Sequence, residues 1–211
     1  MGVSVSRLSR GIPVVAVILA VSLSGSIQAR SAAASGSPAL ANIRIDNFGK
    51  VSDALYRGAQ PAGRDYADLA ALGVKTIIDL TKDGDAQEAS LVQGAGMSFY
   101  RIPMTTHEPP SKDKVAEFLK LVDDPANQPV YVHCQGGRHR TGVMTAVYRM
   151  TKDHWTADQA FAEMKKYGFG ADFLHPEFKQ FVHAYQPEVR APAVAAISVS
   201  RGPTASAAPL R

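Results

Sequence analysis

The chain has 211 residues, of which 45% are hydrophobic and 20% charged, and its formal net charge is +4. This length and composition predict one globular domain that can bury a core without disulfides or metals. The positive charges are scattered along the chain, which argues against nucleic-acid binding and fits an anionic substrate. The single cysteine, Cys134, excludes an intrachain disulfide and every multi-cysteine metal site.

The first 29 residues have the layout of a secretory signal peptide. Arg7 and Arg10 precede an apolar run over residues 12–23, and small residues up to Ala29 follow it. The run is shorter than the ~20 residues that span a bilayer. We therefore expect cleavage near residue 29 or 34, export to the periplasm or the medium, and no stable membrane insertion. An uncleaved N-terminal tether is the alternative.

Three segments follow the predicted signal peptide. Residues 30–41 are rich in Ala, Ser and Pro, which predicts a flexible lead-in. Residues 188–211 have a similar composition and no periodic apolar face, which predicts a disordered tail. The folded domain is predicted over residues 42–187.

The apolar pattern of this domain alternates between strands and helices. Strands are predicted at residues 54–57, 74–80, 97–103 and 129–133. Helices are predicted at residues 65–72, 88–94 and 142–150, and from residues 111, 156 and 176 onward. The alternation predicts an α/β fold, a three-layer βαβ domain with a central, mostly parallel sheet flanked by helices. Ligands of such sheets bind beyond the carboxyl ends of strands, and Cys134 lies at one such end.

The strand that ends at His133 leads directly into a glycine-containing loop and then into a helix. The sequence there is His-Cys-Gln-Gly-Gly-Arg-His-Arg-Thr-Gly over residues 133–142. Successive backbone N–H groups and the helix N-terminus converge on one point in such a segment and bind an oxyanion. The same field stabilises a thiolate at Cys134. Arg140, six residues later, can hold two phosphoryl oxygens through its planar guanidinium group.

These parts predict phosphoryl transfer without a metal or another cofactor. Cys134 attacks phosphorus in line and forms a phosphocysteine, which water then hydrolyses. Arg140 and the loop amides stabilise the transition state, and the Thr141 hydroxyl helps the sulfur to leave. His133 is expected to brace the loop through hydrogen bonds. The predicted phosphate-binding residues are Gln135, Gly136, Gly137, Arg138, His139 and Arg140.

The segment matches the signature His-Cys-x-x-Gly-x-x-Arg-Thr/Ser-Gly, and the chain resembles the protein tyrosine and dual-specificity phosphatase superfamily. Residues 47–58 and 72–80 are similar to the opening of the compact atypical dual-specificity phosphatases of bacteria, plants and fungi. The likeness covers about residues 45–185. It implies the cysteine phosphatase fold and a shallow pocket that takes a phosphoprotein or a small phosphate ester. We expect a monomer.

The resemblance fails at the general acid. Family members supply an Asp three positions before the first proline of an Asp-x-x-Pro-Pro loop, and that position is Thr106 here. His107, Glu108 and Asp113 are nearby, and Glu108 is the predicted acid. The alternative is that all three are solvated loop residues. A substrate with a good leaving group would need less protonation.

Several alternatives stay open. Arg138 and His139 either contact further phosphates, as in relatives that act on inositol phosphates or pyrophosphates, or they point to solvent. Hydrolysis of inositol phosphates or pyrophosphates is therefore the alternative within this fold. A non-catalytic phosphate-binding module and a rhodanese-like sulfurtransferase are the alternative functions. Arg57 and Arg101 are expected to form salt bridges, and the alternative is that they line the cleft.

Overall fold

The structure, a computed structural model, describes residue 2 and residues 42–188. Apart from residue 2, the predicted signal peptide and the lead-in over residues 30–41 lie outside the described residues. The predicted tail lies outside them from residue 189 onward. None of the described helices is both long enough and apolar enough to cross a membrane.

The centre of the domain is a five-stranded sheet with the strand order β1-β2-β5-β3-β4. Its strands are β1 (Gly49–Lys50), β2 (Leu55–Gly58), β3 (Thr76–Thr81), β4 (Ser98–Met104) and β5 (Val130–His133). Strands β2, β5, β3 and β4 run parallel, whereas β1 is antiparallel to β2. The prediction of an α/β domain with a mostly parallel sheet is confirmed, and β5 lies in the middle of that sheet.

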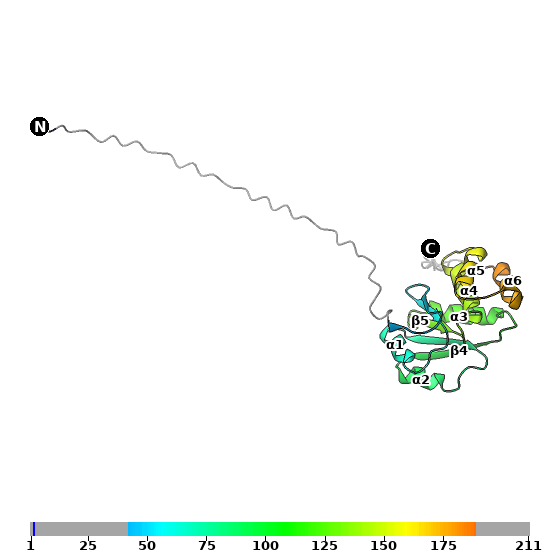
Figure 1. Cartoon of the computed structure of the whole chain (residues 1–211), viewed down its shortest axis with the longest axis horizontal. Coiled ribbons are helices and arrows are strands. Elements are labelled where there is room, and N and C mark those ends of the chain that lie inside the picture. The colour runs from blue at the N-terminus through cyan, green and yellow to red at the C-terminus, as the bar shows by residue number, and fades with distance from the viewer. Residues whose placement is uncertain (1, 3–41, 189–211) are drawn as a thin grey trace, which may run out of the picture. The chain divides into compact units, whose positions relative to one another are not determined.

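Helices flank both faces of the sheet (Figure 1). They are α1 (Asp65–Ala71), α2 (Glu88–Gly94), α3 (Lys112–Asp123), α4 (Arg140–Lys152), α5 (Ala157–Lys166) and α6 (Pro176–Ala184), with a short 3₁₀ helix, η2 (Asp172–Leu174). Leu69 of α1 and Val92 of α2 share one core with Ile77 of β3. Phe118 of α3 shares the opposite core with Ile78. Adjacent residues of β3 thus point to opposite faces of the sheet, because side chains alternate along a strand.

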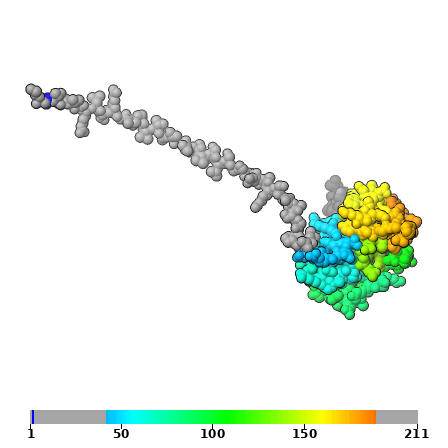
Figure 2. All heavy atoms as spheres, viewed as in Figure 1, coloured from blue at the N-terminus to red at the C-terminus, as the bar shows by residue number. Residues whose placement is uncertain are grey.

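Helix α4 is covered on both sides. Met144 packs with the sheet core, while Val143 and Ala146 pack with α5 and α6. Those two helices, yellow to orange in Figure 2, form one continuous body on the outer side of α4. The helix that follows the loop at Cys134 is consequently buried along most of its length.

Local sequence explains where several helices begin. Ser111 caps α3, and Thr156 caps α5 in a capping box that Gln159 closes. Helix α4 begins at Arg140, two residues before the predicted range 142–150. Strand β1 and helix η2 were not predicted, since two or three residues carry no periodic apolar signal.

Candidate active site

The loop between β5 and α4 surrounds a small pocket. Cys134 directly follows β5 and is 3% exposed. The pocket has a volume of about 240 Å³. Its lining residues are Thr106, Cys134, Gln135, Gly136, Arg138, His139 and Arg140. The structure therefore brings five of the six predicted phosphate-binding residues to the pocket, together with the predicted nucleophile.

Gly137 is the predicted loop residue that does not line the pocket. Its φ angle is 64°, in the left-handed region that glycine adopts without strain. A Cβ atom at this position would overlap the backbone of Gly58 and Ala59, at the end of β2. The loop thus rests directly on the neighbouring strand, and glycine is required there for two reasons.

Arg140 and Thr141 are the first residues of α4, and both are buried. The Arg140 Nη1 atom donates to the carbonyl oxygen of Met104 (3.3 Å) and lies 3.9 Å from the Asp83 Oδ1 atom. Within residues 42–188, neither Arg140 Nε nor Thr141 Oγ1 has a hydrogen-bond partner. These two buried groups have unused capacity, as a phosphate ligand and a leaving thiolate would require.

A buried polar network lies behind the loop. The His133 Nε2 atom is 2.9 Å from Glu88 Oε1, which also accepts a hydrogen bond from Gln60 Nε2 (2.7 Å). Beside them, Arg101 Nε donates to Asp79 Oδ2 (2.7 Å), so the salt bridge predicted for Arg101 is confirmed. Asp79, Glu88 and His133 each place one ligand-type atom within 4.8 Å of the others. Protein donors already engage both carboxylates.

The ring of His139 lies tilted against that of a second histidine, His175, beside the pocket. Its ring centroid is 3.9 Å from that of His175, and its Nε2 atom is 3.0 Å from the carbonyl oxygen of Phe169. Burial, followed by the positive charge that His175 can carry, lowers the pKa of His139. The His175 Nδ1 atom lies 3.1 Å from the carbonyl oxygen of Thr106. Sequence reasoning gave His175 no role at the site, because it lies in a separate segment.

The loop after β4 places Thr106, and no carboxylate, at the pocket. Glu108 is exposed and is not among the lining residues, and His107 and Asp113 are also exposed. Thr106, which stands at the family's acid position in the sequence, therefore lines the pocket itself. The role predicted for Glu108 stays a prediction.

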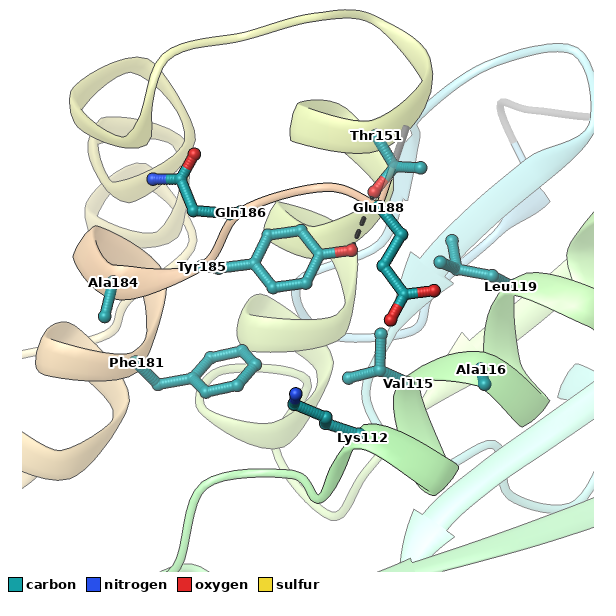
Figure 3. A pocket seen from close by; sticks show the side chains of 10 residues that line it. All are labelled: Lys112, Val115, Ala116, Leu119, Thr151, Phe181, Ala184, Tyr185, Gln186 and Glu188. Atoms are coloured by element: carbon teal, nitrogen blue, oxygen red, sulfur yellow. Dashed lines mark hydrogen bonds between the residues drawn. The ribbon is translucent and has the colours of Figure 1, made fainter. Parts of the chain in front are cut away.

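A larger groove lies between α3, α4 and α6 (Figure 3). Its volume is about 420 Å³, and apolar side chains such as Val115, Leu119 and Phe181 line it. The hydroxyl group of Tyr185 hydrogen-bonds that of Thr151 at this groove (2.9 Å). The groove shares no lining residue with the pocket at Cys134 and has no nucleophilic thiol.

Comparisons with known proteins agree with this geometry. Residues 43–181 match the family described as "DSP-PTPase phosphatase fused to NAD+ Kinase". The chain is 34% identical to the dual specificity protein phosphatase TpbA of Pseudomonas aeruginosa over 158 residues, which are 74% of this chain and 71% of that protein. It is 28% identical over 133 residues to the inositol diphosphatase SIW14 of Saccharomyces cerevisiae, covering 60% and 47% of the two chains.

Solved structures show the same relationship. The catalytic domain of the PP-IP phosphatase SIW14 from S. cerevisiae superposes with a TM-score of 0.61 at 28% identity, covering 68% of this chain and 88% of that one. TpbA of P. aeruginosa, solved in complex with pTyr, gives a TM-score of 0.57 at 27% identity, covering 65% and 83%. The chain therefore belongs to the protein tyrosine and dual-specificity phosphatase superfamily, among its compact atypical dual-specificity members.

Proposed function

We propose that this protein is a cysteine-dependent phosphatase that hydrolyses phosphate monoesters of the tyrosine and dual-specificity class through a phosphocysteine. The observation that carries the proposal is the buried Cys134 in a pocket of about 240 Å³ that is otherwise lined by the glycine-containing loop, Arg140 and Thr106. A pocket of this size accommodates a phosphoryl group and part of its ester. TpbA, a relative solved with pTyr, supports phosphotyrosine as one substrate.

Each pocket residue has a defined part in this reaction. The Cys134 thiolate attacks phosphorus, and the ester oxygen leaves on the opposite side. Arg140 and the loop amides bind the three equatorial oxygens, where negative charge develops. Thr141, whose hydroxyl group has no other partner in the described residues, donates to the sulfur as water releases phosphate.

Glu108 is proposed as the general acid. The loop that carries it also carries Thr106, which lines the pocket and precedes Glu108 by two residues. Because Glu108 is exposed and outside the pocket, this role requires the loop to move toward a bound substrate. Loops of this kind commonly close over substrates on the microsecond to millisecond timescale.

Steady-state hydrolysis of p-nitrophenyl phosphate tests the main proposal. Wild-type protein should release phosphate, and both Cys134→Ser and Arg140→Lys should abolish measurable turnover. Binding of the ester without hydrolysis would instead identify a phosphate-binding module. Thiocyanate formation from thiosulfate and cyanide would identify a sulfurtransferase.

Inositol pyrophosphates are the second candidate substrate class. Arg138 and His139 line the pocket beside Cys134 and can bind additional phosphate groups. The relative SIW14 carries the name inositol diphosphatase. The leaving group of a phosphoanhydride is itself a phosphate, which departs without protonation. Such a substrate suits a pocket with Thr106 at the usual acid position. Comparison of kcat/KM for an inositol pyrophosphate and a phosphotyrosine peptide distinguishes the two classes, and Arg138→Gln should selectively impair the former.

Export to the periplasm or the medium is proposed from the N-terminal sequence. Its support is the order of Arg7 and Arg10, an apolar run and the small residues up to Ala29. N-terminal sequencing of the protein recovered from cell fractions tests it. Export predicts a new N-terminus near residue 30 or 35 in the periplasmic or extracellular fraction, whereas an intact N-terminus in the membrane fraction would favour a tether.

A further inference from the structure

Three consecutive backbone carbonyls of the catalytic loop are bound from outside the loop. All three donors belong to residues 47–60, the segment that contains β1 and β2. The bonds run from Gln60 N–H to Gln135 O (3.2 Å), from Asn47 Nδ2 to Gly136 O (2.8 Å) and from Arg57 Nη2 to Gly137 O. One N-terminal segment therefore fixes the outward face of this loop.

The planar peptide bond relates that outward face to the pocket. In a trans peptide, the carbonyl of one residue and the N–H group of the next point in opposite directions. Carbonyls 135–137 that are held outward consequently direct the N–H groups of residues 136–138 to the other side. Gly136 and Arg138 line the pocket on that side. The orientation of the anion-binding amides thus depends on donors some 75 to 90 residues away in the sequence.

The surroundings of Arg57 are unusual for a charged side chain. Its side chain is fully buried, and its guanidinium carbon lies 4.0 Å from the centroid of the Tyr167 ring. The salt bridge predicted for Arg57 is wrong: within residues 42–188 no carboxylate pairs with it, and its Nε and Nη1 atoms have no hydrogen-bond partner. Burial lowers the pKa of Arg57, and negative charge at Tyr167, Glu163 and Cys134, in that order, opposes this effect.

A buried cation without a paired carboxylate is costly unless another negative charge compensates it. The two negative charges that the reaction brings to this place are the Cys134 thiolate and the bound phosphoryl group. Both lie across the loop that Arg57 contacts. The catalytic cycle therefore adds negative charge beside a cation that the fold buries without an ion pair and with the Tyr167 ring against it.

We propose that Asn47 and Arg57 are positioning residues of the phosphatase: they hold the loop carbonyls outward so that the amides face phosphate, and Arg57 supplies buried positive charge behind Cys134. The inference rests on the proposed function. It attributes part of the pocket's anion affinity and part of the stability of the Cys134 thiolate to residues 47–60, which lie outside the signature at residues 133–142.

The test measures anion binding and thiol reactivity in addition to turnover. Asn47→Asp keeps the shape of the side chain at a position with φ of 53°, but removes the N–H donor. Arg57→Met removes the charge and the donor, and Arg57→Lys keeps the charge. Arg149→Met is the matched control, because Arg149 also stacks on an aromatic ring (Trp155, 4.4 Å) and donates to a backbone carbonyl (Val51, 2.9 Å) away from the pocket.

The expected pattern separates positioning from stability. Arg57→Met should raise the inhibition constant for orthovanadate, slow the alkylation of Cys134 by iodoacetamide at neutral pH, and lower kcat/KM by about 10²-fold. Arg57→Lys should recover part of each loss. Asn47→Asp should weaken orthovanadate binding about fivefold. Arg149→Met should lower the thermal midpoint of unfolding but leave the inhibition constant for orthovanadate at its wild-type value.

Two results would overturn the inference. One is wild-type orthovanadate inhibition and alkylation in a folded Arg57→Met variant. The other, decisive if Arg57→Met does not fold, is wild-type orthovanadate inhibition in Asn47→Asp. Failure of the proposed function would look different, because wild-type protein itself would then hydrolyse no phosphate ester.

Discussion

His139 shows how burial sets the charge of a single residue at the pocket. Its ring is partly buried and lies near His175, Arg138 and Arg140, and burial and these positive charges disfavour the protonated form. Near neutral pH the fold therefore holds a neutral imidazole beside the phosphate site. Because the Nε2 proton faces the carbonyl oxygen of Phe169, the Nδ1 atom of the neutral ring can only accept a hydrogen bond.

The lowered pKa of His139 predicts a pH-dependent stability. The unfolded chain takes up this proton near the ordinary histidine value of 6.5, before the folded chain does. The contribution to stability is therefore complete above that value and is lost as the pH falls through the lower folded pKa. Between about pH 7.5 and about pH 5.5, the thermal midpoint should fall more in wild type than in His139→Asn. Equal falls in both proteins would contradict the assignment.

The missing aspartate at position 106 predicts a dependence on the leaving group. Glu108→Gln should reduce hydrolysis of phenyl phosphate more than that of p-nitrophenyl phosphate, whose leaving group needs little protonation, within the ~10²–10⁴ range of general acid catalysis. Thr106→Asp should restore phenyl phosphate hydrolysis in that variant. A leaving-group effect seen in Asp83→Asn and absent from Glu108→Gln would move the role to Asp83, whose carboxylate lies 3.9 Å from Arg140.

At the scale of elements, the catalytic loop is stabilised by its contact with the end of β2. Gly137 has a positive φ angle, and its Cα faces the backbone of Gly58 without space for a methyl group. Gly136 differs, since a Cβ there would meet only the Arg138 side chain at 3.8 Å. The two adjacent glycines of this loop thus differ in whether the surrounding structure has space for a Cβ atom.

This difference predicts unequal effects of alanine. Gly137→Ala should lower the free energy of unfolding by more than ~1–2 kcal/mol, because backbone overlap adds to the cost of a left-handed φ. Gly136→Ala should change it by less than ~1 kcal/mol. Urea unfolding of both variants measures the difference, and similar losses would contradict the contact between the loop and β2.

The whole molecule shows which features a sequence can predict. The parallel sheet, its helices and the contiguous loop from Cys134 to Arg140 follow from local periodicity and spacing, because each depends on neighbours in sequence. Contacts such as that of Asn47 with Gly136 or of Glu88 with His133 depend on β5 lying between β2 and β3. That strand order has no local signal.

Arg57 is the clearest example of this limit. An arginine in a short predicted strand suggests a salt bridge, yet β2 lies between β1 and β5, and its arginine donates to the catalytic loop. The structure accordingly places the nucleophile on one segment and its supporting charge on another. The sheet is what joins the two.

The central claim is that Cys134 is phosphorylated during turnover, and trapping that adduct tests it most directly. Acid quenching of wild-type protein during hydrolysis of p-nitrophenyl phosphate, followed by mass spectrometry of the peptide that contains residue 134, should show a phosphoryl group on the cysteine. The adduct should be absent from Cys134→Ser. Hydrolysis by wild type without such an adduct, or undiminished hydrolysis by Cys134→Ser, would contradict the mechanism.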